Sequence, residues 1–327
     1  MGWGSGSVEF PYLIAPLDAL KTKAQSDGTT ITSSPNDNAS QGASAAQSAD
    51  IAIVCINADA GEGYITVEGN AGDRKDLNAW HNGNDLVKAV AAVNKKTVVV
   101  VHAVGPILME EWISNPNVVA VVWAGLPGQE SGNGLVDVLY GASPSGKLPY
   151  TIAKKAEDYG TTIARGDDKN WDLFIDYRRF DKNNIEPRFE FGFGLSYTNF
   201  TFSELSVSGA PKSGPATGTK IPGGPADLWE TVATVTAKVA NSGGVAGAEV
   251  PQLYIGYPAS AGEPPKQLRG FTKLKLEAGA SGTATFKLRR RDLSVWENGK
   301  WTVPSGEFGV FVGASSRDVR LTGKIVV

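Results

Sequence analysis

Hydrophobic positions in the first half of the chain form three continuous runs, at residues 51–57, 97–101 and 118–123. Short runs that are apolar throughout are typical of strands buried on both faces of a parallel sheet. Between the first two runs, residues 84–94 instead repeat with a helical period that puts four aliphatic side chains on one face. This alternation of strand and helix predicts a three-layer α/β sandwich with a mainly parallel sheet over residues 1–157.

Three further helices are expected around this sheet. Residues 11–24 have a helical pattern, residues 107–113 follow the breaker Gly105-Pro106, and residues 130–140 follow a glycine-rich turn. The sheet should therefore be flanked by four helices.

Beyond residue 200 the pattern changes to seven short alternating runs separated by turn signals, at residues 200–208, 231–241, 248–257, 266–276, 282–288, 306–315 and 319–327. This pattern predicts an all-β fibronectin type III-like sandwich over residues 200–327, because the chain has no cysteine pair of the immunoglobulin kind. Residues 158–199 are rich in aromatic side chains, which predicts an ordered linker. Residues 208–228 are rich in Gly and Pro, which predicts a long surface loop.

Composition narrows the class of protein. The 327 residues, 41% of them hydrophobic, are enough for two ordinary domains. A formal charge of −3 without a basic block argues against nucleic acid or an anionic membrane surface as a partner. No apolar stretch has the roughly 20 residues needed to span a bilayer. The only cysteine, Cys55, lies in an apolar run and is expected to be a small buried side chain.

The destination of the chain is indicated only weakly by its sequence. The amino end lacks the basic and apolar regions of a secretion signal. The low Cys and Met content and two glycosylation sequons, at Asn38 and Asn199, nevertheless favour an extracellular, secreted glycoprotein.

Candidate chemistry is concentrated in "GEGYITVEGNAGDR", residues 61–74, directly after the first apolar run. Ligands of parallel α/β sheets bind outside the carboxyl ends of the strands, which is where this loop begins. Glu62 lies between two glycines, and the ring of Tyr64 is suited to the face of a sugar. A carboxyl beside an aromatic ring in a partly dry cleft has a raised pKa, as the proton donor of a glycosidase requires.

The same loop is equally well explained as a solvated turn, in which Asp73 and Arg74 form an ion pair that fixes its shape. Other chemistries fit the sequence less well. His81 and His102 have no partner at metal-ligand spacing, so neither a metal nor a cofactor is expected. Residues 125–134 lack the motif of a nucleotide-binding loop, and no strand is followed by the turn of a serine hydrolase.

Five segments together resemble a known family. They are "GEGYITVEGNAGDR", "WHNGNDLVKAV", "VVVVHAVGPI", "VVWAGLPGQESGNGLVDVLYGASPSGKLPYTIAK" and "RFEFGFGLSYTNF". Over essentially its whole length, the chain resembles the second and third domains of fungal β-glucosidases of glycoside hydrolase family 3.

The resemblance implies a retaining enzyme, active in cellulose degradation, that releases glucose from cellobiose and related β-glucosides. By the family's motif, Glu62 is the general acid/base and Tyr64 lines the aglycone subsite. The family's nucleophile, an Asp, lies on an N-terminal barrel domain that is absent from these residues. A retaining mechanism needs two carboxyls about 5 to 5.5 Å apart, so we expect the chain alone to be inactive. The alternatives are a non-catalytic carbohydrate-binding or structural module and, by fold analogy only, a nucleotide-binding protein.

Overall fold

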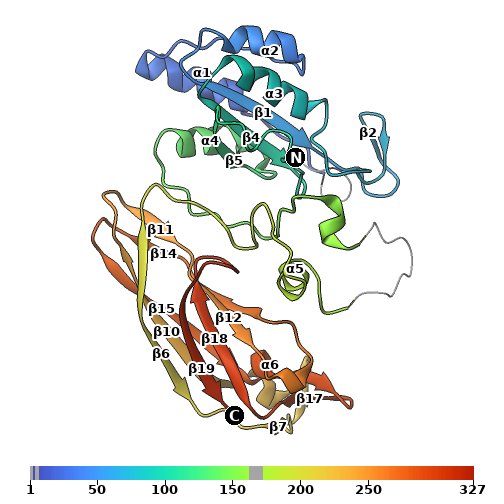
Figure 1. Cartoon of the computed structure of the whole chain (residues 1–327), viewed down its shortest axis with the longest axis vertical. Helices are drawn as coiled ribbons and strands as arrows, with labels where there is room; N and C mark the ends of the chain where they lie inside the picture. Colours follow the sequence, from blue (N-terminus) through green and yellow to red (C-terminus); the bar gives the residue numbers. More distant parts are fainter. Residues whose placement is uncertain (1–2, 4–6, 162–171) are drawn as a thin grey trace. The chain divides into compact units, whose positions relative to one another are not determined.

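The computed structural model describes residues 3, 7–161 and 172–327 of the chain (Figure 1). Contacts between residues divide it into two compact units. The first consists of residues 1–142 and 153–156, and the second of residues 143–152 and 157–327.

A three-stranded parallel sheet forms the centre of the first unit. Its order is β1 (Ala52–Ala58), β4 (Thr97–Ala103) and β5 (Val118–Trp123). The register pairs Ala52 with Thr97 and Ala58 with Ala103, so β1 and β4 end at the same edge. The expected parallel sheet is confirmed, and its three strands are those that the apolar runs predict.

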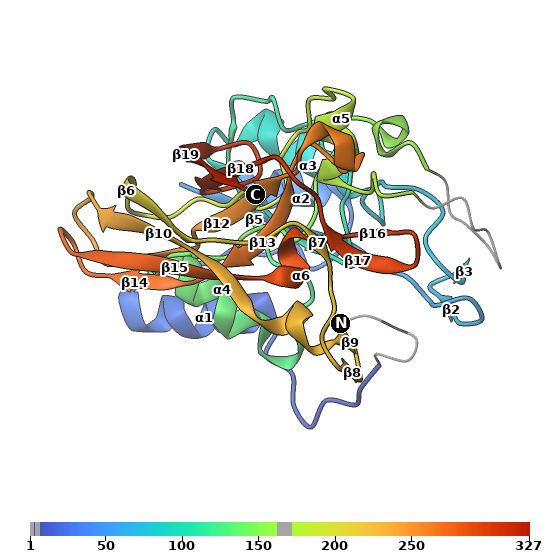
Figure 2. The same cartoon turned by 90° about the horizontal axis from the view of Figure 1, so that it is seen from below.

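Four helices accompany this sheet. They are α1 (Pro16–Asp27), α2 (Ala39–Ala46), α3 (Gly83–Val93) and α4 (Ser131–Leu139). Helix α2 packs on α3, since Gly42 leaves room for Leu86, and α1 packs on α4, where Gly132 lies against Ala15. Figure 2 shows these two pairs on either side of β5, which gives the three layers of an α/β sandwich.

Two helix expectations need correction. Residues 107–109 are irregular and residues 110–114 form turns, so no helix covers 107–113, although Ile107, Met109 and Trp112 are buried as their spacing suggests. Helix α1 begins at Pro16, later than residue 11, because the fixed φ of proline suits the first helical position. Helix α2 was not expected at all; its residues are mostly Ala and Ser, and Asn38 caps it by accepting a hydrogen bond from the Gln41 amide.

Strand β1 is buried on one face only. Ala52, Val54 and Ile56 are buried, whereas Ile53 is 37% exposed and Cys55 is also exposed. The expectation of a buried cysteine is therefore wrong, because nothing in the first unit fully covers this side of the edge strand. The thiol nevertheless lies among closely spaced protein atoms, and this desolvation raises the pKa of Cys55 to about 11.

Two antiparallel sheets form the second unit, visible as separate layers in Figure 2. One has the order β15 (Ser281–Arg289), β10 (Thr231–Asn241), β6 (Phe200–Gly209). The other has the order β13 (Gln267–Phe271), β12 (Gln252–Gly256), β18 (Glu307–Gly313), β19 (Val319–Val326). Fully buried Val235, Leu253 and Phe308 belong to the core between them. This arrangement confirms the expected β-sandwich.

Shorter elements complete the second unit. They are η3 (Ala156–Tyr159, which begins in the first unit), α5 (Tyr177–Lys182), β7 (Gly214–Pro215), β8 (Lys220–Ile221), β9 (Gly224–Pro225), η4 (Ala226–Trp229), β11 (Gly247–Glu249), η5 (Ala259–Ala261), β14 (Leu274–Leu276), α6 (Arg290–Leu293), β16 (Val295–Glu297) and β17 (Lys300–Val303).

The described part of the expected linker is ordered and packs on the sandwich. The Tyr177 hydroxyl accepts a hydrogen bond from the Leu268 amide at 2.9 Å. Asp181, with its side chain 8% exposed, pairs with Lys266 at 2.6 Å and with Arg317 at 3.2 Å. These bonds fix α5 to the sandwich. Residues 162–171, also part of the expected linker, lie outside the described residues.

The Gly/Pro-rich segment 208–228 is also ordered. Asp227 accepts hydrogen bonds from the amides of Thr217 and Gly218, and Arg290 donates to the carbonyl of Gly214. These bonds hold the loop against α6.

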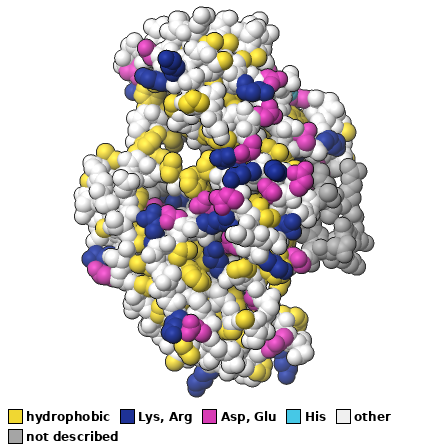
Figure 3. Space-filling view, in the orientation of Figure 1, with side chains coloured by type: hydrophobic (Ala, Val, Ile, Leu, Met, Phe, Trp, Pro, Cys, Tyr) yellow, Lys and Arg dark blue, Asp and Glu magenta, His cyan; other side chains and the backbone are white. Residues whose placement is uncertain are grey.

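Acidic and basic side chains are interspersed on the face shown in Figure 3. Among the described residues, no helix has the length and apolar character required to cross a membrane.

Candidate functional site

The loop after β1 is closed at its base by backbone hydrogen bonds. The Gly61 amide donates to the Gly72 carbonyl at 2.9 Å, and the Gly72 amide donates to the Ile65 carbonyl at 2.8 Å. A Cβ at Gly61 would lie 2.3 Å from the Ile65 oxygen, so only glycine fits there. The base of the loop thus continues directly from β1 at the carboxyl edge of the sheet.

A small hairpin forms the far part of the loop. Strands β2 (Thr66–Val67) and β3 (Asn70–Ala71) are joined by Glu68 and Gly69, which have φ of +49° and +83°. Two successive positive φ angles are typical of the tight hairpin turn that matches strand twist. With the backbone in this conformation, Oε2 of Glu68 lies 2.6 Å from Nε2 of His81.

Glu62 also has a left-handed backbone, with a φ of +37°. Four of the eight described non-glycine residues with positive φ fall between residues 62 and 82: Glu62, Glu68, His81 and Asn82. Such conformations cost about 1–2 kcal/mol per residue and concentrate at functional sites. Glu68 belongs to the hairpin turn, and His81 and Asn82 lie beyond the loop, so it is the strain at Glu62 that supports a role for this loop beyond turning the chain.

Glu62 and Tyr64 both face solvent. Glu62 is exposed, and Tyr64, at 80%, is the most exposed of the large hydrophobic residues described. The dry cleft expected around Glu62 is not formed by the first unit. Water would have to be excluded by another surface placed over the loop.

The other candidate residues are separate from this loop in sequence. Asn38 and Asn199 are both exposed, which leaves each sequon accessible. His102 lies at the end of β4, opposite Asn57, with its Nε2 buried and without a hydrogen-bond partner among the described residues. Burial lowers the pKa of His102 from its usual value.

A hollow of about 390 Å³ lies within the first unit. Glu68, Asn70, Lys75, Asp76, Asn78, Ala79, Trp80, His81 and Asn82 line it, whereas Glu62 and Tyr64 do not. Sequence reasoning missed this site, because the residues are brought together by the hairpin tip and by the left-handed residues His81 and Asn82. Within the described ranges, no group of three His, Cys, Asp or Glu side chains is placed to bind a metal ion.

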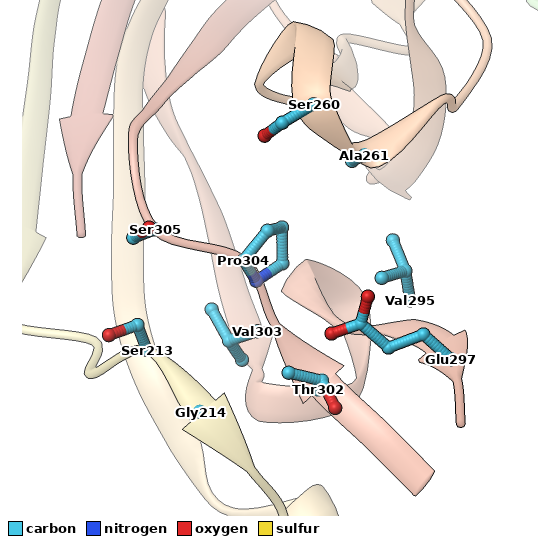
Figure 4. A pocket seen from close by; sticks show the side chains of 10 residues that line it. All are labelled: Ser213, Gly214, Ser260, Ala261, Val295, Glu297, Thr302, Val303, Pro304 and Ser305. Atoms are coloured by element: carbon cyan, nitrogen blue, oxygen red, sulfur yellow. The ribbon is translucent and has the colours of Figure 1, made fainter. Parts of the chain in front are cut away.

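A second hollow of about 390 Å³ lies in the second unit (Figure 4). Its walls carry the hydroxyls of Ser213, Ser260, Thr302 and Ser305 around Val303 and Pro304. Its lining contains one carboxylate, Glu297, and therefore lacks the second carboxylate that paired acid and base catalysis would need. The first unit remains the better candidate for catalysis.

The chain combines a loop on a parallel sheet with a β-sandwich that follows it. Comparison with models of known families gives the same two domains. Residues 1–197 match the glycosyl hydrolase family 3 C-terminal domain, and residues 249–316 match the fibronectin type III-like domain. The chain belongs to glycoside hydrolase family 3.

Individual relatives are fungal proteins. The chain is 63% identical to the probable beta-glucosidase L of Aspergillus terreus and 61% identical to beta-glucosidase cel3A of Pyricularia oryzae, over 100% of its own length. It is also similar to the crystal structure of beta-D-glucoside glucohydrolase from Trichoderma reesei, with a TM-score of 0.98, 63% identity and 100% of this chain covered.

The matches cover only part of those relatives. The chain spans 45% and 46% of the two curated relatives and 47% of the Trichoderma reesei chain. It thus spans about half the length of the proteins it matches.

Proposed function

We propose that the chain is the C-terminal part of a retaining β-glucosidase that removes terminal β-D-glucosyl residues from cellobiose and related β-glucosides. In this proposal Glu62 is the general acid/base. It protonates the departing glycosidic oxygen and later removes a proton from the attacking water. Tyr64 lies against the departing sugar or aglycone.

The observation that carries the proposal is the presentation of Glu62. The residue follows the carboxyl end of β1, lies between Gly61 and Gly63, and has a strained φ of +37° beside an 80% exposed tyrosine. A carboxyl in an ordinary solvated loop has no need of a strained backbone. The names of the two curated relatives, a probable beta-glucosidase and a beta-glucosidase, support the same chemistry.

The nucleophile is proposed to come from a barrel domain of the same enzyme. A retaining glycosidase places its two carboxyls about 5 to 5.5 Å apart. Exposed Glu62 needs such a partner and a surface that excludes water. The half-uncovered β1 and the length of the relatives, about twice that of this chain, favour a further domain.

The test compares two preparations on an aryl β-glucoside: the 327-residue chain and the complete enzyme that contains it. We expect turnover by the complete enzyme and none by the chain alone. Clear turnover by the chain, abolished by Glu62→Gln, would show that the nucleophile lies within these residues and would overturn the barrel proposal. Equal turnover by the complete enzyme and its Glu62→Gln variant would overturn the role of Glu62.

We also propose that the enzyme is secreted, acts in cellulose degradation, and carries glycans on Asn38 and Asn199. Both side chains are exposed, and the cap that Asn38 provides uses its oxygen, leaving the amide nitrogen for a glycan. Protein secreted from a fungal host should lose mass on enzymatic removal of N-glycans. A variant with both sequons changed to Gln should not.

A further inference from the structure

The hollow beside the β2–β3 hairpin has unused hydrogen-bonding groups. Glu68 engages His81 through Oε2 only, and Asp76 accepts from the Asn78 amide through Oδ1 only. Among the described residues, no hydrogen bond or ion pair engages the second carboxylate oxygens of both residues, the side-chain amide of Asn78 or the indole nitrogen of Trp80. Donors and acceptors are therefore both available at one place.

Half-buried Trp80 supplies an apolar wall to these polar groups. Its ring meets that of His81 edge-on, with centroids 6.0 Å apart, and its amide donates to the Asn57 carbonyl at the end of β1. The wall is thus fixed to the sheet. The space exceeds the roughly 300 Å³ of a small-molecule site, but its lining is mainly polar around one indole ring, whereas most such sites are mainly apolar. This composition suits a ligand rich in hydroxyls.

The charges around the hollow select a neutral ligand. The lining carries two carboxylates, Glu68 and Asp76, against one ammonium, Lys75, so phosphate and other anions would meet net repulsion. A metal ion would need a third acidic or imidazole ligand placed to bind it, which the described residues do not provide. A polyhydroxyl compound offers both donors and acceptors and has C–H faces that pack on an indole ring.

We propose that this hollow binds one glucosyl unit of a β-glucan oligosaccharide, as an additional saccharide site outside the reacting bond. The choice of glucose as the sugar rests on the proposed β-glucosidase function. Trp80 packs against the sugar ring. Asp76, Asn78 and Glu68 exchange hydrogen bonds with its hydroxyls.

The proposal is tested on the 327-residue chain labelled with ¹⁵N. The chain has eight tryptophans, and the indole N–H signal of Trp80 is the one lost in the Trp80→Phe variant. Titration with cellotetraose should move this signal to saturation. Glycerol, sodium phosphate and calcium chloride, each at the same concentration, should not move it.

Two variants test the contacts. Asp76→Ala and Asn78→Ala each remove a group that is exposed, so the fold should survive. Each should weaken cellotetraose binding about tenfold, the effect of losing roughly one hydrogen bond to a charged or well-placed group. Trp296→Phe is the matched control, because this tryptophan is 60% exposed and lies in the second unit. It should leave binding unchanged.

Three results would overturn the proposal: no movement of the Trp80 signal, movement by phosphate or calcium, or binding that Asp76→Ala and Asn78→Ala leave intact. The measurement is independent of catalysis, since Glu62→Gln in the same chain should leave cellotetraose binding unchanged. If Glu62→Gln abolishes hydrolysis by the complete enzyme but cellotetraose does not bind to the hollow, only this inference is refuted. If cellotetraose binds to the hollow but the Glu62→Gln enzyme hydrolyses normally, only the catalytic proposal is refuted.

Discussion

Gly61→Ala is the sharpest perturbation of the loop that presents Glu62. The added Cβ would lie 2.3 Å from the Ile65 oxygen and 3.0 Å from the Gly72 oxygen, both backbone atoms. Gly61 has no positive φ, so alanine meets no conformational penalty there and the effect is steric. The loop must open at its base.

The expected cost follows from the hydrogen bonds that opening breaks. Two backbone bonds, Gly61 to Gly72 and Gly72 to Ile65, are lost. At about 0.5–1.5 kcal/mol each, the loop loses about 1–3 kcal/mol of local stability. Since 1.4 kcal/mol corresponds to a factor of ten, hydrogen exchange of the Gly72 amide should accelerate roughly 5- to 150-fold.

The matched control is Gly134→Ala in α4. A Cβ there meets nothing within 4 Å, and alanine favours a helix over glycine. This variant should leave Gly72 exchange at the parent value. In the complete enzyme, Gly61→Ala should also reduce turnover about 100-fold, the effect of misplacing a reacting group by roughly 1 Å. Gly72 exchange within twofold of the parent in Gly61→Ala would refute the steric reasoning.

Three further predictions concern other parts of the chain. Asp181→Ala leaves Lys266 without its carboxylate partner and leaves Arg317 with Glu186 as its remaining one. The change should cost about 3 kcal/mol, measured by urea unfolding, and a cost below about 0.5 kcal/mol, the level of an exposed ion pair, would contradict it. Because desolvation raises the pKa of the Cys55 thiol to about 11, alkylation by iodoacetamide should be slow at pH 7 and accelerate about tenfold per pH unit. A rate equal to that of the unfolded chain at pH 7 would contradict it. Burial lowers the pKa of His102 in the folded chain. As pH falls, the imidazole of the unfolded chain is therefore protonated first, at about its usual pKa of 6.5. Stability is lost from that pH down through the lower pKa of the folded chain. His102→Gln should reduce that loss, measured by urea unfolding at pH 7 and pH 5, and an unchanged pH dependence would contradict it.

Elements that depend on a strong local pattern were predictable. Strands β1, β4 and β5 are apolar runs that a parallel sheet requires, and α3 has a clear apolar face. Segment 107–113 has helical spacing but forms no helix, since burial of Ile107, Met109 and Trp112 does not require a regular helix.

In the second unit, the accuracy of the predicted strand boundaries depended on recognising the residues that form turns. Two expected strands are each divided, one at Val250-Pro251 and the other at Thr272-Lys273. The hairpin β16–β17 was missed, although Asn298-Gly299, with φ of +49° and +73°, is a strong hairpin signal in the sequence. Attention to that dipeptide would have found it.

The candidate site was predictable only in part. The position of the loop at the carboxyl end of β1 followed from the strand pattern, and the glycines around Glu62 suggested its unusual backbone. The hollow was not predictable, because it depends on the positive φ of Glu68, which its residue type gives no reason to expect, and on the contact of Glu68 with His81, which is distant in sequence.

The most direct test of the account is the dependence of Glu62→Gln on the leaving group, measured in the complete enzyme. A general acid matters most for a poor leaving group, and its contribution is typically about 10²–10⁴-fold. Asp73→Asn, an exposed acid in the same loop, is the control. The account predicts that Glu62→Gln lowers kcat/KM, which reports the glucosyl-transfer step, by at least about 100-fold for cellobiose and far less for 2,4-dinitrophenyl β-glucoside, whose phenolate needs no proton. Equal losses on the two substrates, or equal losses in Glu62→Gln and Asp73→Asn, would contradict the role of Glu62 as proton donor.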